Sequence, residues 1–154
     1  MHPMLKTLTT AAALSVAALA STAQAEMTAK TSPHSVSETM DRLEAAVTAA
    51  GATVFARVDH AAGAASVDQD LRPTQLLIFG NPKLGTPAMQ TAQTAGLDLP
   101  LRVLAYADGE GVVHVTYHAP STLFATHDLL ADAPYLKMMT GALDKLTNKA
   151  VAAE

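Results

Sequence analysis

The chain has 154 residues, no cysteine and a formal net charge of −4 at pH 7. The lack of cysteine excludes disulfides, thiol catalysis, iron–sulfur clusters and cysteine-linked haem. An acidic chain with no basic cluster and no tryptophan is also a poor partner for nucleic acid and for anionic membrane surfaces.

The first 25 residues have the pattern of a secretory signal. Lys6 precedes an apolar run over 11–20, and small residues stand at Ala23 and Ala25, which predicts cleavage after Ala25. The run is shorter than the ~20 residues that span a bilayer, and no later run is long enough. We therefore expect a periplasmic or secreted protein without membrane insertion. The mature chain, residues 26–154, suits one domain, and its nine basic and 14 acidic residues give a charge of −5.

The next stretch alternates between strand and helix patterns. Residues 27–31 would pair as an edge strand. Apolar residues at helical spacing, after a cap at Ser35 or Ser37, predict an amphipathic helix over 37–50 that ends at Gly51.

Residues 53–59, TVFARVD, alternate as a strand does. This alternation places Val54, Ala56 and Val58 on one face, under the helices, and Phe55 on the other face. Asp59 can cap an alanine-rich short helix over 60–70.

The stretch 71–87, LRPTQLLIFGNPKLGTP, organises the rest of the chain. We predict that its strand, 74–80, is the central one, and that both of its apolar faces are covered. A Gly-Asn-Pro break would end the strand, and a loop would run to Pro87. Thr86 would then cap a short helix over 87–95.

The second half predicts a hairpin followed by helices. Its arms are 101–107 and 112–118, joined by a turn over 108–111. A short helix over 121–128 and a final helix from Pro134 follow, with a frayed tail beyond Asn148. Tyr106 and Tyr117 would pack in the hairpin or line a pocket, and Met138 and Met139 would fill the core.

Three stretches together carry a family resemblance: MDRLEAAVTAAGATVFARVDHAAGA (40–64), LRPTQLLIFGNPKLGTP (71–87) and AGLDLPLRVLAYADGEG (95–111). The chain resembles the bacterial domain of unknown function 302 family over nearly all of its mature length. The resemblance implies an α+β fold like the TATA-binding-protein half-repeat, with an antiparallel sheet, helices packed on one face, and a dimer. It implies no activity, and the nucleic-acid role of the fold's namesake does not transfer.

The segment after the strand at 74–80 is a candidate anion site. Backbone N–H groups at a helix N-terminus would hold a small anionic ligand, with the binding residues Gly80, Asn81, Lys83, Gly85 and Thr86. The spacing of the two glycines is that of a phosphate loop, but Thr86 stands where that motif needs lysine. A strand-to-helix turn built from Gly, Asn and Pro explains the same residues and is more common.

The histidines suggest a second candidate, a copper site with His and Met ligands. His114 and His118 share a strand face, but four residues separate them by about 13 Å, too far for one ion. A site would have to combine one of these two histidines with His60, Met89 or Met138 from elsewhere in the chain, and His60 and His118 are the ligands we predict. Histidines scattered over a solvated surface are the more common explanation.

These observations favour a non-catalytic homodimer that binds a small ligand or a partner, with no cofactor specified by the sequence. The alternatives are a metal-binding protein and an enzyme of unknown class. Asp59 and His60 would be an acid–base pair in such an enzyme, although a helix cap explains Asp59 more simply. The dimer would form over the sheet face that the helices leave open, with Phe55 near the contact, because a large apolar patch is uncommon on a monomer.

Overall fold

A computed structural model describes residues 26–153 and shows five strands in one antiparallel sheet, with the order β1-β5-β4-β3-β2. The strands are β1 (Met27–Ser32), β2 (Thr53–Asp59), β3 (Thr74–Gly80), β4 (Leu101–Ala107) and β5 (Val113–His118). The α-helices are α1 (Val36–Ala49), α2 (His60–Ala65), α3 (Pro82–Thr91), α4 (Pro120–Leu123) and α5 (Pro134–Val151), and the 3₁₀ turns are η1 (Gln93–Leu97) and η2 (Phe124–His127).

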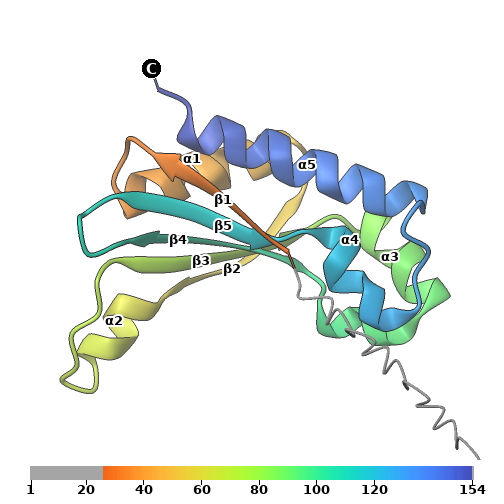
Figure 1. The fold of residues 1–154 in the computed structure, drawn as a ribbon, viewed down its shortest axis with the longest axis horizontal. Coiled ribbons are helices and arrows are strands. Elements are labelled where there is room, and N and C mark those ends of the chain that lie inside the picture. The colour runs from red at the N-terminus through yellow and green to blue at the C-terminus, as the bar shows by residue number, and fades with distance from the viewer. Residues whose placement is uncertain (1–25, 154) are drawn as a thin grey trace, which may run out of the picture.

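Helices α1 and α5 lie side by side over one face of the sheet (Figure 1). Helix α3 lies at the end of the sheet to which β3 leads, and α2 projects from the opposite end. The α+β class and the layer of helices on one face are as the sequence predicts. None of the helices between residues 26 and 153 is long and apolar enough to cross a membrane.

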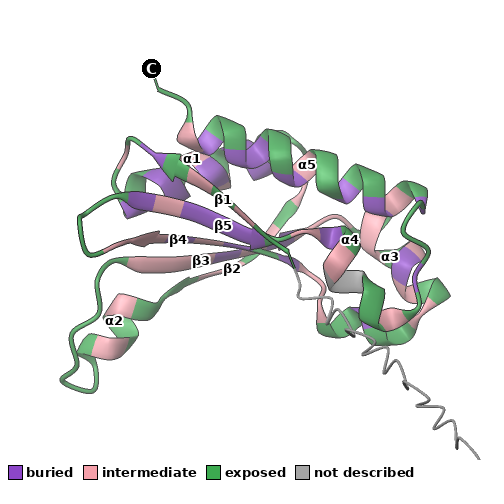
Figure 2. Ribbon diagram, viewed as in Figure 1, coloured by how far each residue is buried: buried purple, intermediate pink, exposed green. Residues whose placement is uncertain are grey.

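The core lies between the sheet and the two long helices (Figure 2). Met40, Leu43 and Val47 of α1 are at most 1% exposed and form the stripe that the helical spacing predicts. In α5, Leu136, Met139, Leu143 and Leu146 face the sheet. Burying a side chain of this size contributes about 1.5–3 kcal/mol, so the two stripes hold both helices on the sheet.

The predicted helix caps at Ser35 and Asp59 are confirmed by hydrogen bonds from backbone amides to their side chains. The Ser35 hydroxyl accepts from the Glu38 amide at 3.2 Å, so α1 starts at Val36 and not at Ser37. The Asp59 carboxylate accepts from the Ala62 amide at 2.9 Å. Gly51 ends α1 with a φ of +72°, a left-handed conformation that favours glycine.

The strand that the sequence predicts to be central, β3, is not the middle strand of the sheet. β3 is the second strand from an edge, and β4 is the middle strand of the five. In β3, Leu77 and Phe79 are buried at 0% and 2% exposure, whereas Leu76 and Ile78 are half-buried. Within one chain, therefore, α1 and α5 cover only the face of Leu77 and Phe79, and the face of Leu76 and Ile78 is left open.

A β-bulge between Val54 and Ala56 overturns the predicted faces of β2. Val54 pairs with Phe79 on the helix side, but after the bulge Val58 pairs with Leu76 on the open face. The extra residue reverses the alternation. Arg57 therefore points to α1, where its guanidinium contacts Asp41 at 2.5 Å.

Two helix boundaries also differ from the prediction. α3 begins at Pro82, five residues earlier, because Asn81 caps it and Pro82 takes its first position. Pro87 therefore lies inside the helix. α5 continues to Val151 because Ala150 is fully buried against the core, so the predicted fraying from Asn148 is wrong. Met138 is 51% exposed, unlike its neighbour Met139.

Candidate functional site

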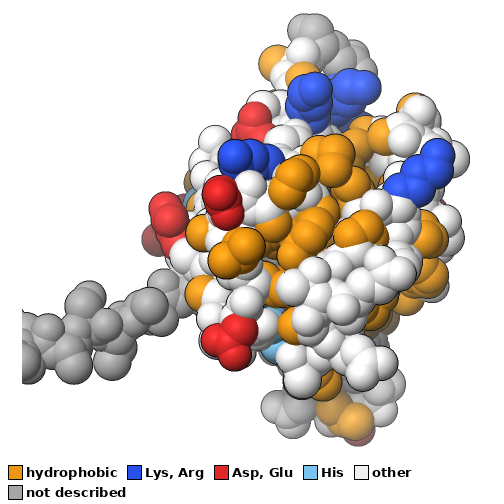
Figure 3. Space-filling model, turned by 90° about the vertical axis from the view of Figure 1, so that its right-hand side faces the viewer, with side chains coloured by type: hydrophobic (Ala, Val, Ile, Leu, Met, Phe, Trp, Pro, Cys, Tyr) orange, Lys and Arg blue, Asp and Glu red, His pale blue; other side chains and the backbone are white. Residues whose placement is uncertain are grey.

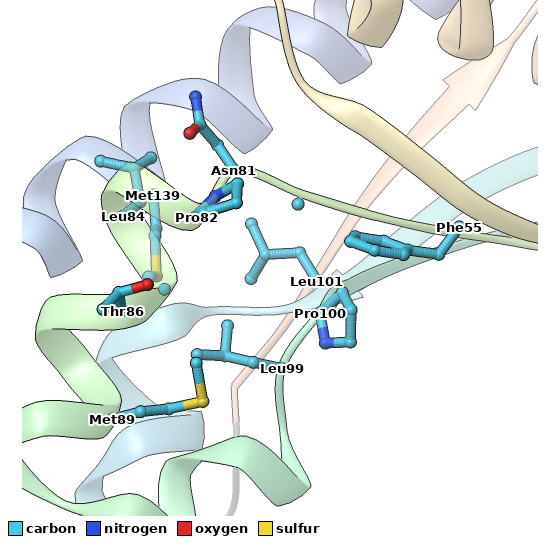
Figure 4. Close-up of a pocket in the computed structure, with 12 residues that line it drawn as sticks. Phe55, Asn81, Pro82, Leu84, Thr86, Met89, Leu99, Pro100, Leu101 and Met139 are labelled. Carbon is cyan, nitrogen blue, oxygen red and sulfur yellow. The ribbon is translucent and has the colours of Figure 1, made fainter.

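An apolar pocket of about 200 Å³ lies where β3 passes into α3. Residues 80–82, 84–86 and 89 form one wall, and residues 99–101 form a second. Phe55 and Met139 reach it from β2 and α5. In Figure 4, Met139 and Leu84 lie opposite the ring of Phe55, with Leu101 and Pro100 between them. Four separate segments of the chain therefore meet around this cavity.

The bulge explains how Phe55 reaches the pocket. Phe55 is the residue without a partner in the β2–β3 register, and its side chain is 57% exposed. Bulges commonly turn a side chain toward a binding site. The Phe55 ring lies beside Gly80, where an added Cβ would be 3.6 Å from Phe55 Cε2 and 3.4 Å from Pro100 Cβ. These are ordinary van der Waals distances, so Phe55 and Pro100 pack on either side of Gly80 at the rim of the pocket.

Four of the five predicted anion-site residues line this pocket: Gly80, Asn81, Gly85 and Thr86. Lys83 does not line it and is exposed on α3. The segment is the first turns of α3 and not the predicted loop, so Thr86 is not a cap.

The first amides of α3 already have acceptors. The Lys83 amide donates to the Asn81 side-chain oxygen at 3.0 Å. The Leu84 and Gly85 amides donate to the Asn81 carbonyl at 2.9 and 3.0 Å. Pro82 has no N–H to offer. The donors on which the anion interpretation depended are used to start the helix.

The predicted metal ligands His60 and His118 are not brought together. His60 follows β2 at one edge of the sheet, whereas His118 ends β5 and pairs with Met27 of β1 near the other edge. Both side chains are exposed. Over residues 26–153, no group of three or more His, Asp or Glu residues is placed to hold a metal ion. Asp59 serves as the α2 cap, and its hydrogen bond with the Ala62 amide lowers the pKa of its carboxyl.

Besides the His34–Glu38 pair at the start of α1, two histidine–carboxylate pairs were missed by sequence reasoning, because their partners lie in turns. His114 Nε2 is 2.6 Å from Asp108 Oδ2, and the Asp108 pKa is lowered by this hydrogen bond. Tyr106 stacks on His114 with 5.2 Å between ring centroids, so it packs in the hairpin and does not line the pocket. The pair holds the β4–β5 turn, where Asp108 also accepts from the Val112 amide.

The second pair joins η1 to η2. His127 Nε2 is 2.6 Å from Asp98 Oδ2, and its Nδ1 is 3.0 Å from the Thr94 hydroxyl. A hydroxyl, an imidazole and a carboxylate in this order would suit acid–base chemistry. The apolar pocket, however, is not lined by any of the three. They fix the turns beside the pocket, with Asp98 directly preceding its lining residue Leu99.

The surface around this end of the molecule is apolar and has few charges at its centre. Figure 3 shows hydrophobic side chains gathered in the middle of this face, with Lys and Arg above and Asp and Glu to one side. The elements at this end carry strongly exposed apolar residues, with Leu97 at 78%, Leu130 at 71% and Met138 at 51%. The pocket therefore opens within an apolar surrounding.

Fold and site together define a small α+β domain with one layer of helices and an apolar pocket at the end of its sheet. The chain belongs to the family described as domain of unknown function DUF302, which matches residues 28–146. An uncharacterized conserved DUF302 protein from Bacillus stearothermophilus has the same fold, with a TM-score of 0.65 and 18% identity over 81% of this chain and 94% of that chain.

Longer relatives contain a similar segment. The chain is 47% identical over 112 residues to the fluoride-specific ion channel FluC 1 of Brucella suis, which is 71% of this chain and 44% of that protein. The fluoride-specific ion channel FluC 2 of Brucella melitensis matches at the same identity over 42% of its length. This chain thus spans less than half the length of these curated relatives.

Proposed function

We propose that this domain is an exported, non-catalytic homodimer that binds a small uncharged ligand in the pocket beside α3. One observation carries the proposal: Phe55 is turned out of the strand alternation by a bulge and lines a cavity whose other walls are mainly Leu, Met and Pro side chains. An exposed phenylalanine contributes little to folding, so its place at a pocket rim is best explained by contact with a ligand.

The size of the cavity limits the ligand. Pockets for drug-sized ligands measure about 300–1,000 Å³, whereas an apolar cavity of about 150 Å³ lined by Leu, Ile and Phe binds benzene. The volume here, about 200 Å³, lies nearer the second value. A ligand of roughly six to nine heavy atoms would fill it, an estimate scaled from the benzene-binding cavity.

The ligand we propose carries no charge. None of the residues that line the pocket has a charged side chain, and the first amides of α3 are occupied. Burying an ion without a partner is costly. Fluoride, the ion in the names of the Brucella relatives, would meet the same penalty, so we do not propose it for this pocket.

The open face of the sheet supports the homodimer. Ala56, Val58, Leu76, Ile78 and Leu104 share this face through their cross-strand pairs. Five strands about 4.8 Å apart, each of about six residues at 3.3 Å, make a face of roughly 24 by 20 Å. Its flat area of roughly 480 Å² is about 60% of the area that each partner buries in a standard interface, about 800 Å². A second copy is the commonest partner for such a face.

The dimer is tested by sedimentation of the mature protein. Leu104, on the middle strand of the open face, is replaced by lysine, and Leu97→Lys is the matched control because Leu97 is exposed on η1. We expect the wild type and Leu97→Lys to be dimers and Leu104→Lys to be a monomer. A monomeric wild type at high micromolar concentration would contradict the dimer.

Export and ligand binding have their own tests. N-terminal sequencing of secreted material should begin at Glu26, and a mature chain that still begins at Met1 would refute export.

For the ligand, a panel of small uncharged and anionic compounds is titrated by calorimetry. We expect stoichiometric binding of uncharged apolar compounds only, and saturable binding of anions alone would refute the proposal.

A further inference from the structure

We infer that the pocket selects an uncharged aromatic ring, of the size of benzene with one or two added atoms, over an aliphatic group of equal volume. The inference rests on the proposed function of the pocket as a ligand site. The volume of the cavity fits both kinds of ligand, but the atoms that form its walls favour one of them.

Two thioethers face the cavity from different elements. Met139 of α5 is 1% exposed, and Met89 of α3 lies against η1, where its Sδ is 3.4 Å from the position of a Cβ on Gly96. Sulfur makes favourable contacts with aromatic rings, particularly at the ring edge. In Figure 4, Met139 lies beside Leu84 at the left of the pocket and Met89 lies below, beside Leu99. A bound ring would therefore meet sulfur along two edges.

An aromatic side chain completes the recognition surface. The Phe55 ring lies at the rim with more than half of its surface exposed. Aromatic pairs prefer offset-stacked or edge-to-face arrangements, both of which gain beyond the area that they bury. A ligand ring would thus cover Phe55 and obtain a contact that a saturated ring of the same size cannot make.

The residues that line the pocket also favour a ligand without charge. Asn81 and Thr86 are the only lining residues with polar side chains, and Asn81 uses its side-chain oxygen to cap α3. Thr86 is exposed, and its single hydroxyl would bond to at most one polar substituent of the ligand. A carboxylate or an ammonium on the ring would have no ionic partner among the lining residues.

Toluene and methylcyclohexane test the inference, since both have a six-membered ring and one methyl group. The readout is a ¹³C-methyl NMR titration of the methionines in the mature wild-type protein. We expect toluene to bind at least tenfold more tightly. Its ring current should shift the Met89 and Met139 methyls, while those of Met27 and Met40 serve as internal references.

Two variants locate the binding. A Cβ on Gly85 would lie 3.6 Å from Leu99 Cδ1 and 4.0 Å from Met89 Cε, so Gly85→Leu should fill the pocket. Gly141→Leu is the matched control, because a Cβ at that position in α5 meets nothing within 4 Å. We expect Gly85→Leu to weaken both ligands more than tenfold and Gly141→Leu to weaken neither.

Phe55→Leu removes the ring and keeps an apolar side chain. We expect it to reduce the preference for toluene at least threefold and to leave methylcyclohexane binding unchanged. Equal affinities of the wild type for the two ligands, both lost in Gly85→Leu, would overturn the aromatic preference and leave the proposed function intact. Binding of neither ligand would overturn both. If Gly85→Leu does not fold, toluene-induced shifts confined to methyls other than Met89 and Met139 would refute the site.

Discussion

Replacing Phe55 with alanine should cost little stability, whereas the same change at Phe79 on the neighbouring strand should cost several times more. Phe79 is 2% exposed, and truncating a core phenylalanine costs about 3–5 kcal/mol. Phe55 is 57% exposed, which leaves 43% of its surface covered. Full burial of such a side chain is worth about 1.5–3 kcal/mol, so the covered part is worth roughly 0.6–1.3 kcal/mol.

The assay is urea unfolding of the wild type and the two variants at one protein concentration, since a dimer makes the midpoint concentration-dependent. We expect a midpoint for Phe55→Ala close to that of the wild type and a much lower one for Phe79→Ala. Equal losses would mean that Phe55 packs as a core residue. The bulge would then not turn it toward the pocket, and the main support for the proposed function would be removed.

Three further outcomes follow from the structure. Gly141→Ala should raise the free energy of unfolding by about 0.5–1 kcal/mol, because it removes a glycine from the interior of α5 and the added Cβ meets no neighbour. A lower melting temperature for this variant would mean that the added methyl group clashes with a neighbouring residue. The hydrogen bond from Lys30 lowers the pKa of Asp144 below its usual value. This pair therefore stabilises the fold above pH ~4, and its contribution is lost as the pH falls through the lowered pKa. In urea unfolding, the difference in free energy of unfolding between wild type and Asp144→Asn should shrink from pH 5 to pH 2, and a constant difference would contradict this. Copper should bind no tighter than micromolar, and submicromolar stoichiometric binding lost on replacing His60 or His118 would reverse this expectation.

Elements with local chemical signals could be predicted from the sequence. The Ser35 and Asp59 caps and the Asp108–Gly111 turn each depend on residues within a few positions of one another. The sequence favours a helix start at Pro82 as strongly as one at Pro87, because Asn81-Pro82 and Thr86-Pro87 each offer a capping residue followed by a first-position proline. The Asn81 bonds decide the competition, and only the structure shows that Pro87 is accommodated five residues into the helix.

The bulge and the pocket could not be predicted, for a physical reason. Strict alternation over β2 assumes a regular register, and one unpaired residue at Phe55 moves Ala56 and Val58 to the open face. No residue of β2 marks that position. The pocket depends on contacts between segments as distant as Phe55 and Met139, which periodicity does not report. Gly80, Asn81, Gly85 and Thr86 were singled out for their amides, but they belong to the pocket because the start of α3 forms one of its walls.

The central claim is tested most directly by a crystal structure of the mature protein grown with toluene. We predict density for the ring in the cavity, in contact with Phe55, Met89 and Met139, and no such density in crystals of Gly85→Leu. A cavity that is filled by the Phe55 side chain itself, or that stays empty at saturating toluene, would contradict the account.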